Sequence, residues 1–119
     1  MIKGIGIDII EIHRVEDLAA RMPKFVQRIL TEREIKKYEW LQGKRKAEYL
    51  AGRFAAKEAF SKAMGTGIGK GLQFTDIEIV QDPLGKPFFS KPFTEGTYLS
   101  ISHSKEYAVA QVIIESSSS

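Results

Sequence analysis

One stretch decides the fold of this 119-residue chain: Gly52-Arg53-Phe54-Ala55-Ala56-Lys57-Glu58-Ala59-Phe60-Ser61-Lys62-Ala63. It lies in a run from about residue 44 to residue 64 that is rich in Ala, Glu, Lys and Leu, with Gly52 as its only glycine or proline. These residues are strong helix formers, so the run predicts one long helix. Apolar side chains, among them Phe54 and Phe60, occur on nearly all sides, and such a helix is expected to be largely buried.

Glu58 is the unusual residue of this helix, because it falls inside the apolar arc between Phe54 and Ala55. A buried carboxylate without a partner is costly or becomes protonated, so Glu58 needs a partner. One interpretation is an ion pair with Lys62, one turn further along the helix. The other is a ligand of a hard cation, with Lys62 directed at the same anionic substrate. The second interpretation requires another carboxylate on a different apolar element.

Residues 1–10 predict a β-strand, because they are rich in isoleucine. Gly4 and Gly6 are unusual inside a strand and indicate a close approach of backbone or ligand. Asp8 is disfavoured in a strand that we expect to be central and buried. Either Asp8 lies at a strand edge or end and bonds to nearby backbone, or it is the second carboxylate that a cation site with Glu58 requires.

The composition restricts the kinds of site that the chain can build. Its length fits one domain, and it has no cysteine, which excludes disulfides, thiolate zinc sites and cysteine nucleophiles. Two histidines make a zinc site uncommon, while oxygen-ligated magnesium remains open. The net charge of +3 suits an anionic partner. Neither an apolar run of transmembrane length nor a signal-peptide pattern is present, so we expect a cytoplasmic protein that does not bind a membrane.

A basic helical segment follows the first strand over residues 11–30, and Pro23 is expected to split it into two short helices. Met22 and Phe25 place apolar surface beside its charges. Such a face is either solvated or a docking surface for an acidic partner. The charges in question are Arg14, Arg21, Lys24 and Arg28.

Two further helix signals precede the central run. Thr31 and Glu34 form a capping-box pattern that predicts a helix over residues 32–42, ended by Gly43. The run Lys44-Arg45-Lys46 then opens the central helix, where positive charge opposes the helix dipole. These charges are either solvated or available to a phosphate.

The last third of the chain reads as β structure, with strands expected at 74–80 and 88–89 and a hairpin of 98–103 with 107–114. His103 lies at the hairpin turn and is interpreted either as a turn residue or as a phosphate contact. The serine run 116–119 predicts a disordered tail, which leaves residues 1–115 as the domain.

Two motifs together resemble a known family. Gly6-Ile7-Asp8 and the later Phe54–Ala63 segment resemble the two signature motifs of the 4'-phosphopantetheinyl transferases. The chain length, the basic first helix and Ser100-Ile101-Ser102-His103-Ser104 are similar to the small bacterial branch of that family. The resemblance implies an α+β fold: a mainly antiparallel sheet with a long central helix packed across it. It also implies a homotrimer with substrate sites at subunit interfaces.

The resemblance further implies a reaction, the transfer of the phosphopantetheine arm of coenzyme A to a serine of an acyl carrier protein, for fatty acid biosynthesis. Asp8 and Glu58 would be the Mg²⁺ ligands, together with pyrophosphate oxygens and water. With Lys62, which would contact the phosphates or relay a proton, they form the expected catalytic group. The general base is left open between a metal-bound water and Glu58.

The resemblance assigns the remaining cations to the two substrates. The acidic carrier protein would meet the basic first helix through Arg14, Arg21, Lys24 and Arg28. The residues expected to contact coenzyme A are Lys44, Arg45, Arg53, Lys57, Lys62 and His103. Two alternatives from other classes are a basic module that binds RNA and a magnesium-dependent phosphohydrolase. The first gives Asp8 and Glu58 no role, and no ribonucleoprotein or K-homology motif is present, so we expect no nucleic-acid partner.

Overall fold

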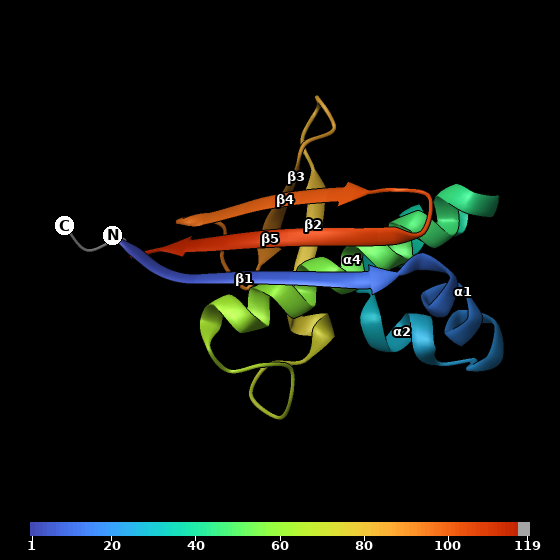
Figure 1. The fold of residues 1–119 in the computed structure, drawn as a ribbon, viewed down its shortest axis with the longest axis horizontal. Coiled ribbons are helices and arrows are strands. Elements are labelled where there is room, and N and C mark those ends of the chain that lie inside the picture. Colours follow the sequence, from blue (N-terminus) through green and yellow to red (C-terminus); the bar gives the residue numbers. More distant parts are fainter. Residues whose placement is uncertain (117–119) are drawn as a thin grey trace.

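The computed structural model describes residues 1–116 of the chain. Within them the two ends of the sequence meet in one sheet, and the helices lie between (Figure 1). In chain order the elements are β1 (Ile2–Glu11), α1 (Ile12–Arg21), α2 (Phe25–Ile29), α3 (Glu32–Trp40), α4 (Gly43–Met64), the 3-10 turn η1 (Phe74–Asp76), β2 (Glu78–Gln81), β3 (Pro87–Lys91), β4 (Thr97–His103) and β5 (Tyr107–Glu115). The predicted α+β class, with antiparallel strands and one long helix, is confirmed.

Strands β1, β5 and β4 form an antiparallel sheet in the order β1-β5-β4, while β2 and β3 form a separate antiparallel ladder. The predicted hairpin is the β4–β5 pair, and β1 pairs with the other side of β5 so that Asp8 lies opposite Ala110. Among the described residues β1 is therefore an edge strand.

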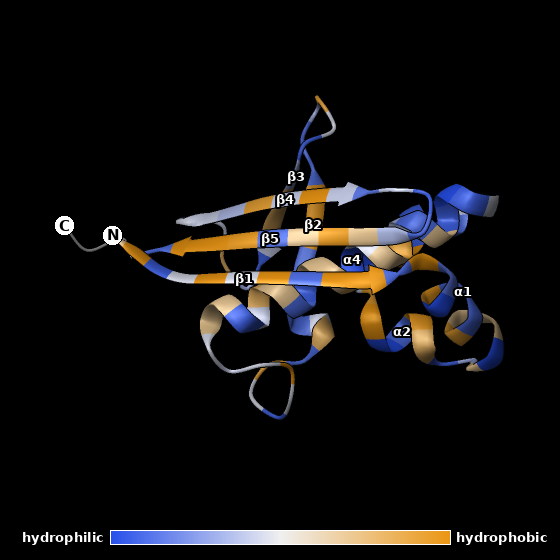
Figure 2. Ribbon diagram, viewed as in Figure 1, coloured by the Kyte–Doolittle hydropathy of each residue, from blue (hydrophilic) through white to orange (hydrophobic). Residues whose placement is uncertain are grey.

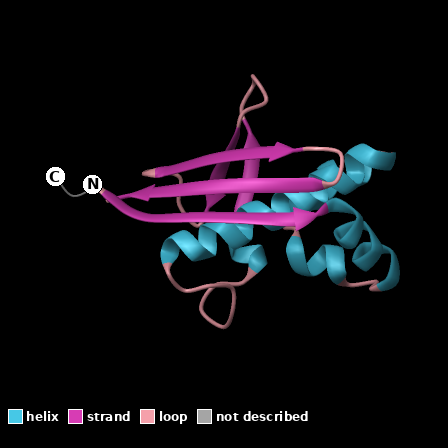
Figure 3. Cartoon of the chain, in the orientation of Figure 1, coloured by secondary structure: helices cyan, strands magenta, loops and turns pink. Residues whose placement is uncertain are grey.

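Helix α4 runs between these two sets of strands, as Figure 3 shows, with the β1-β5-β4 sheet on one side and the β2–β3 ladder on the other. Its alanines pack with Ala110 and Val112 of β5, while Phe60 packs with Phe89 of β3 at 4.8 Å between ring centroids. Strands on both sides explain why the helix is apolar on nearly all of its surface.

The two glycines of β1 allow the strand to lie directly on α4. A Cβ atom on Gly4 would overlap the carbonyl oxygen of Ala63, and one on Gly6 would overlap that of Ala59. The close backbone approach that these glycines indicate in the sequence is therefore confirmed. It brings the α4-facing side of β1, which includes Asp8, close to the C-terminal half of the helix.

The basic segment forms two short helices, α1 and α2, separated at Pro23 as predicted. Their apolar sides, with Val15 and Ile29, pack on Leu50 and Ala51 of α4 in a second hydrophobic cluster. This arrangement buries one side of α1 and α2 and leaves their charged side chains exposed.

Three expectations about local structure are wrong. Residues 74–80 form a 3-10 turn before the short β2, and the helix after Thr31 ends at Trp40, so that Gly43, with φ of 58°, begins α4. The isoleucines of β1 are not buried on both faces, because the strand lies at an edge and one face of the sheet is uncovered. The capping box of Thr31 with Glu34 is confirmed.

The strands β1 and β5 are rich in apolar residues, which are orange in Figure 2. Several apolar side chains of the sheet are exposed. Ile5, Ile7 and Ile9 of β1 are 57%, 58% and 61% exposed, and Tyr98 of β4 is 55% exposed. None of the described helices is long and apolar enough to cross a membrane. Of the predicted serine tail, Ser116 donates its backbone N–H to the Met1 carbonyl oxygen at 2.8 Å, and residues 117–119 lie outside the described part.

Candidate active site

Asp8, Glu58 and Lys62 meet where β1 lies on α4. The Lys62 ammonium donates to Asp8 Oδ1 at 3.1 Å and to the Ile7 carbonyl oxygen at 3.0 Å. Lys62 therefore pairs with the acid of the strand and not with Glu58, its neighbour on the helix. Within the described part of the chain, Glu58 has no ion pair of its own. The interpretation of Glu58 as one half of a local helical ion pair is thus not supported.

The electrostatics of Glu58 show that the two carboxylates are neighbours. The pKa of Glu58 is raised above its usual value, first because the group is partly buried and second because the negative charge of Asp8 is close. Lys62 acts in the opposite direction, but it does not cancel the other two effects. The two acids come from distant parts of the sequence, and among the described residues only Asp8 pairs with Lys62, so the Glu58 carboxylate has no counter-charge of its own.

The donor set fits a magnesium ion. Mg²⁺ prefers hard oxygen ligands and is usually held by one or two carboxylates, with substrate phosphates and water completing its shell. Asp8 and Glu58 supply two carboxylates, and Asp8 and Lys62 are partly open to solvent, with side chains 15% and 51% exposed. The described residues contain no group of three or more His, Cys, Asp or Glu side chains arranged to hold a metal by themselves. A cation here would depend on ligands that a substrate provides.

A cavity of about 490 Å³ lies along the N-terminal half of α4 and gathers three of the predicted phosphate contacts, Arg45, Arg53 and His103. Arg45 and Arg53 come from α4, and His103 comes from the end of β4. The turn between β2 and β3 closes another side through Gly85 and Pro87. With Lys37 of α3, four basic side chains line this hollow, which makes it suitable for an anion.

Arg53 is held in this cavity by packing. The residue is only 7% exposed, and its guanidinium lies 4.2 Å from the centre of the Tyr49 ring. Its Nε atom has no hydrogen-bond partner among the described residues. Burial lowers the pKa of Arg53, an effect that the Tyr49 hydroxyl and the Glu34 carboxylate oppose. An ordered guanidinium that lines the cavity is prepared to bind an anion there.

His103 has an acidic neighbour that the sequence reading missed. Its Nδ1 lies 3.5 Å from Glu48 Oε2. The helix residues lining the cavity, Arg45, Glu48, Tyr49, Gly52 and Arg53, follow the spacing i, i+3, i+4, i+7, i+8. This spacing marks one face of a helix and was the signal available in the sequence.

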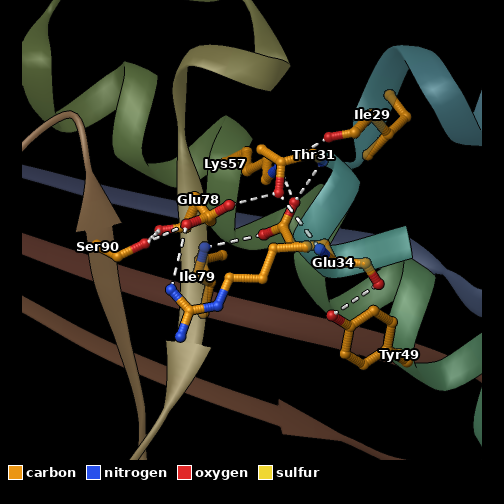
Figure 4. Close-up of polar contacts among 9 residues, drawn as sticks. Ile29, Thr31, Glu34, Tyr49, Lys57, Glu78, Ile79 and Ser90 are labelled. Carbon is orange, nitrogen blue, oxygen red and sulfur yellow. Dashed lines mark hydrogen bonds and ion pairs between the residues drawn. The ribbon is translucent and has the colours of Figure 1, made fainter. Parts of the chain in front are cut away.

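The other three predicted coenzyme A contacts lie outside this cavity, and one of them is Lys62, beside Asp8. Lys44 lines a different hollow, beside Glu11 and Lys105. Lys57 is fully buried, and its ammonium donates to Glu34 Oε1 at 2.6 Å and to the Ile29 carbonyl oxygen at 2.7 Å (Figure 4). The assignment of Lys57 as a phosphate contact is wrong for this structure, because its donors are directed into the protein and no ligand can reach them.

The predicted docking residues divide into two places. Arg21, Lys24 and Arg28 surround a small hollow of about 340 Å³ with Met22 and Phe25 at the junction of α1 and α2. Arg21 also pairs with Asp17 at 3.0 Å on the exposed side of α1. Arg14 is exposed on α1 but does not line this hollow.

Comparison with known proteins gives the family. The family model of the 4'-phosphopantetheinyl transferase superfamily matches residues 4–112. The chain belongs to this superfamily. This phosphopantetheinyl transferase is 58% identical over 120 residues to the holo-[acyl-carrier-protein] synthase of Anoxybacillus flavithermus, and the match covers 100% of both chains.

Solved structures of other transferases share the fold. A holo-(acyl-carrier-protein) synthase from Bacillus anthracis, in complex with CoA (3',5'-ADP), matches with a TM-score of 0.90 and 55% identity, covering 98% of this chain and 99% of the other. The Helicobacter pylori holo-[acyl-carrier-protein] synthase in complex with coenzyme A gives a TM-score of 0.79 at 37% identity, covering 93% and 99%. The resemblance based on the two sequence motifs is thereby confirmed.

Proposed function

We propose that this transferase moves the 4'-phosphopantetheine arm of coenzyme A onto a serine of apo acyl carrier protein. The reaction would depend on magnesium and release adenosine 3',5'-bisphosphate, in the cytoplasm and for fatty acid biosynthesis. The observation that carries the proposal is the meeting of Asp8 and Glu58 beside Lys62. Relatives that are named holo-[acyl-carrier-protein] synthase, one of them with bound CoA (3',5'-ADP), support the choice of substrates.

In this proposal Asp8 and Glu58 hold the metal. Bound there, Mg²⁺ would neutralise charge on the pyrophosphate of coenzyme A and stabilise the leaving group. Lys62 is already fixed by Asp8 and the Ile7 carbonyl oxygen, and half of its side chain remains exposed. Its ammonium can therefore add positive charge at the same place without first being ordered.

The bond changes define what the protein has to supply. The serine oxygen forms a bond to the phosphorus that carries the pantetheine arm, and the bond from that phosphorus to the bridging oxygen of the adenosine side breaks. The serine proton must go to a base. Either Glu58 or a water held by the metal would accept it.

The cavity beside α4 would hold the phosphate groups at the adenosine end of coenzyme A. Lys37, Arg45 and Arg53 provide its positive charge, and His103 adds to it when protonated. Arg53 is the anchor that we favour, because its guanidinium is already ordered against Tyr49. A donor fixed before binding loses little freedom when the ligand arrives.

We also propose that the chain acts as a homotrimer with sites completed between copies. Arg53 and Glu58 are five residues apart on α4, which places them about 140° apart around the helix. The phosphate cavity contains none of Asp8, Glu58 and Lys62. One substrate would reach both places if the cavity of one copy faced the carboxylates of another. The exposed isoleucine face of β1 is an apolar surface suited to such an assembly.

The carrier protein would dock on α1 and α2. Arg21, Lys24 and Arg28 offer positive charge around a partly apolar hollow that contains Met22 and Phe25. An acidic helix with a few apolar side chains would complement this surface in both charge and shape.

Incubation with coenzyme A, Mg²⁺ and an apo carrier protein tests the function. We expect the carrier protein to gain the mass of the phosphopantetheine arm, measured by mass spectrometry, and the gain to disappear when EDTA replaces Mg²⁺. Free phosphopantetheine without a mass gain would indicate a phosphohydrolase. Neither product would leave a binding module as the alternative, for which an RNA-binding titration is the check.

Reversing the charge of Arg21 tests the docking surface. The Arg21→Glu variant should raise the Michaelis constant for the carrier protein by an amount equivalent to roughly 1 kcal/mol, and by more at low salt. The Michaelis constant for coenzyme A should stay constant. Lys70→Glu, in the exposed loop after α4, is the matched control, because it makes the same change of charge outside the proposed surface. Equal effects on both substrates would refute this docking surface.

A further inference from the structure

Lys57 and Glu34 form a buried ion pair directly beside the Arg53 guanidinium. Lys57 follows Arg53 by one helical turn on α4, and Glu34 comes from the first turn of α3. Glu34 favours the protonated form of Arg53, while burial and, to a smaller extent, the charge of Arg53 lower the pKa of Lys57. All three are buried, so these interactions are only weakly screened by solvent.

The Glu34 carboxylate accepts three hydrogen bonds, from Lys57, Thr31 and Ile79 (Figure 4). Its Oε1 accepts from the Lys57 ammonium at 2.6 Å and from the Thr31 backbone N–H at 2.9 Å. Its Oε2 accepts from the Ile79 backbone N–H at 2.8 Å. Among the described residues no ion pair joins Glu34 to Arg53, although the two line the same small hollow beside β2.

Without Lys57, the Arg53 guanidinium would be free to pair with Glu34. A buried carboxylate that has lost its cation seeks another, and Arg53 is the neighbouring cation with an unused donor. An Arg53–Glu34 pair would neutralise the cavity where the anion is expected. With Lys57 in place, the three groups keep a net positive charge, and that charge belongs to Arg53.

We propose that Lys57 is a positioning residue for substrate binding: by taking up the Glu34 carboxylate, it keeps the Arg53 guanidinium free for a phosphate group of coenzyme A. The identity of the ligand, coenzyme A, rests on the proposed function. The competition of Lys57 and Arg53 for the Glu34 carboxylate does not. It accounts for a fully buried lysine directly beside the carboxylate Glu58 in the sequence, and Lys57 itself touches no substrate.

Coenzyme A binding by four proteins tests the proposal, measured by isothermal titration calorimetry with Mg²⁺ present. Lys57→Met leaves Glu34 without its cation and should raise the dissociation constant at least about tenfold. The double variant Glu34→Gln/Lys57→Met removes the competing carboxylate and should return to within about threefold of the wild type. Arg53→Gln marks the affinity that is left when the guanidinium is absent.

Binding by the folded variants separates this role from a merely structural one. If Lys57 only stabilised the fold, the folded Lys57→Met protein would bind coenzyme A like the wild type, and its loss would appear in the free energy of unfolding instead. That result, or a double variant that binds as weakly as Lys57→Met, would overturn the proposal. In steady-state assays the Michaelis constant for coenzyme A should change, while kcat and the Michaelis constant for the carrier protein should not.

Two further measurements keep the test decisive. If Lys57→Met does not fold by circular dichroism, Lys57→Gln replaces it, because its amide can still donate to Glu34 without neutralising the carboxylate. If the wild type does not bind coenzyme A, the proposed function fails. The series is then repeated with inorganic pyrophosphate as the probe, where the same order of affinities is expected and an unchanged affinity across the variants would overturn the proposal.

Discussion

Lys57 and Glu58 are consecutive residues of one helix, yet their surroundings are opposite. Lys57 is fully buried, and its charge is matched by Glu34, which accepts two further backbone hydrogen bonds. Glu58 is partly exposed and has a carboxylate for a neighbour, and the one cation nearby is bonded to that neighbour. The charge on the Lys57 side of the helix is fully paired within the protein, whereas the carboxylates on the Glu58 side require a cation from outside the chain. The comparison teaches that buried charge alone does not mark a functional site, and that incomplete pairing does.

Asp8→Asn tests the Glu58 side and should have the largest effect. Arm transfer should fall by about a thousandfold or more, equivalent to about 4 kcal/mol of transition-state stabilisation, because the metal would lose a charged ligand. Thermal unfolding without Mg²⁺ should change little, since Asn can still accept from Lys62. Near wild-type activity in this variant would end the assignment of Asp8 as a metal ligand.

Glu34→Ala tests the Lys57 side. Removing the carboxylate leaves the buried Lys57 ammonium without a counter-charge, with only the Ile29 carbonyl oxygen as acceptor, and leaves the buried Ile79 N–H without an acceptor, so the free energy of unfolding should fall by about 3 kcal/mol. Chemical denaturation measures the loss. Glu39→Ala, at an exposed position of the same helix, is the control and should change stability by less than about 0.5 kcal/mol. A loss no greater than the control's would contradict the view that this pair supports the fold.

Gly6→Ala tests the contact of β1 with α4, which brings Asp8 close to Glu58. The added methyl group would overlap the Ala59 carbonyl oxygen, so β1 must move away from α4, at a cost of about 2 kcal/mol. The shift should also weaken Mg²⁺-dependent arm transfer, because Asp8 follows Gly6 by two residues. Gly71→Ala, in open space in the loop after α4, is the matched control. Unfolding curves and activity are compared for both variants.

Glu58→Gln should have the smallest effect on stability, and its sign depends on pH. Because the pKa of Glu58 is raised above the ordinary value of 4.5, ionising this group opposes folding of the metal-free protein. At pH 7 the variant should therefore be more stable than the wild type, by less than about 1 kcal/mol because solvent screens the site. The gain should shrink as pH falls through the raised pKa toward 4.5, and saturating Mg²⁺ should reverse it. Melting temperatures at pH 5 and pH 7, with and without Mg²⁺, measure these changes.

The sequence pattern singled out Asp8 and Glu58, the acids of the site between β1 and α4, while leaving their role open, and it gave no sign of the buried Lys57–Glu34 pair. Asp8 and Glu58 were recognisable because each is a carboxylate in an apolar pattern, and Gly4 and Gly6 indicated the close approach that joins them. The role of Lys57 depends on Glu34, whose place in a capping box already explained it locally. A side chain that serves both a cap and a distant ion pair cannot be recognised from local spacing.

The burial of β1 also depended on information that the sequence pattern lacks. A run of isoleucines predicts a strand, but its exposure depends on whether a neighbour covers its outer face, which the arrangement of the other strands decides. The grouping of the cavity residues, in contrast, did not depend on how the strands are arranged. Arg45, Glu48 and Arg53 follow a simple helical spacing and could have been grouped from the sequence alone.

The contact of Gly4 and Gly6 with α4 has a thermodynamic consequence. Asp8 and Glu58 are far apart in an unfolded chain, so a cation that needs both would have almost no affinity for that state and would bind only the native one. Ion occupancy and folding would then be linked equilibria. Above the dissociation constant, each tenfold rise in free ion would add about 1.4 kcal/mol to the free energy of unfolding. The absence of two β-carbons would thus couple the stability of the whole molecule to the magnesium concentration around it.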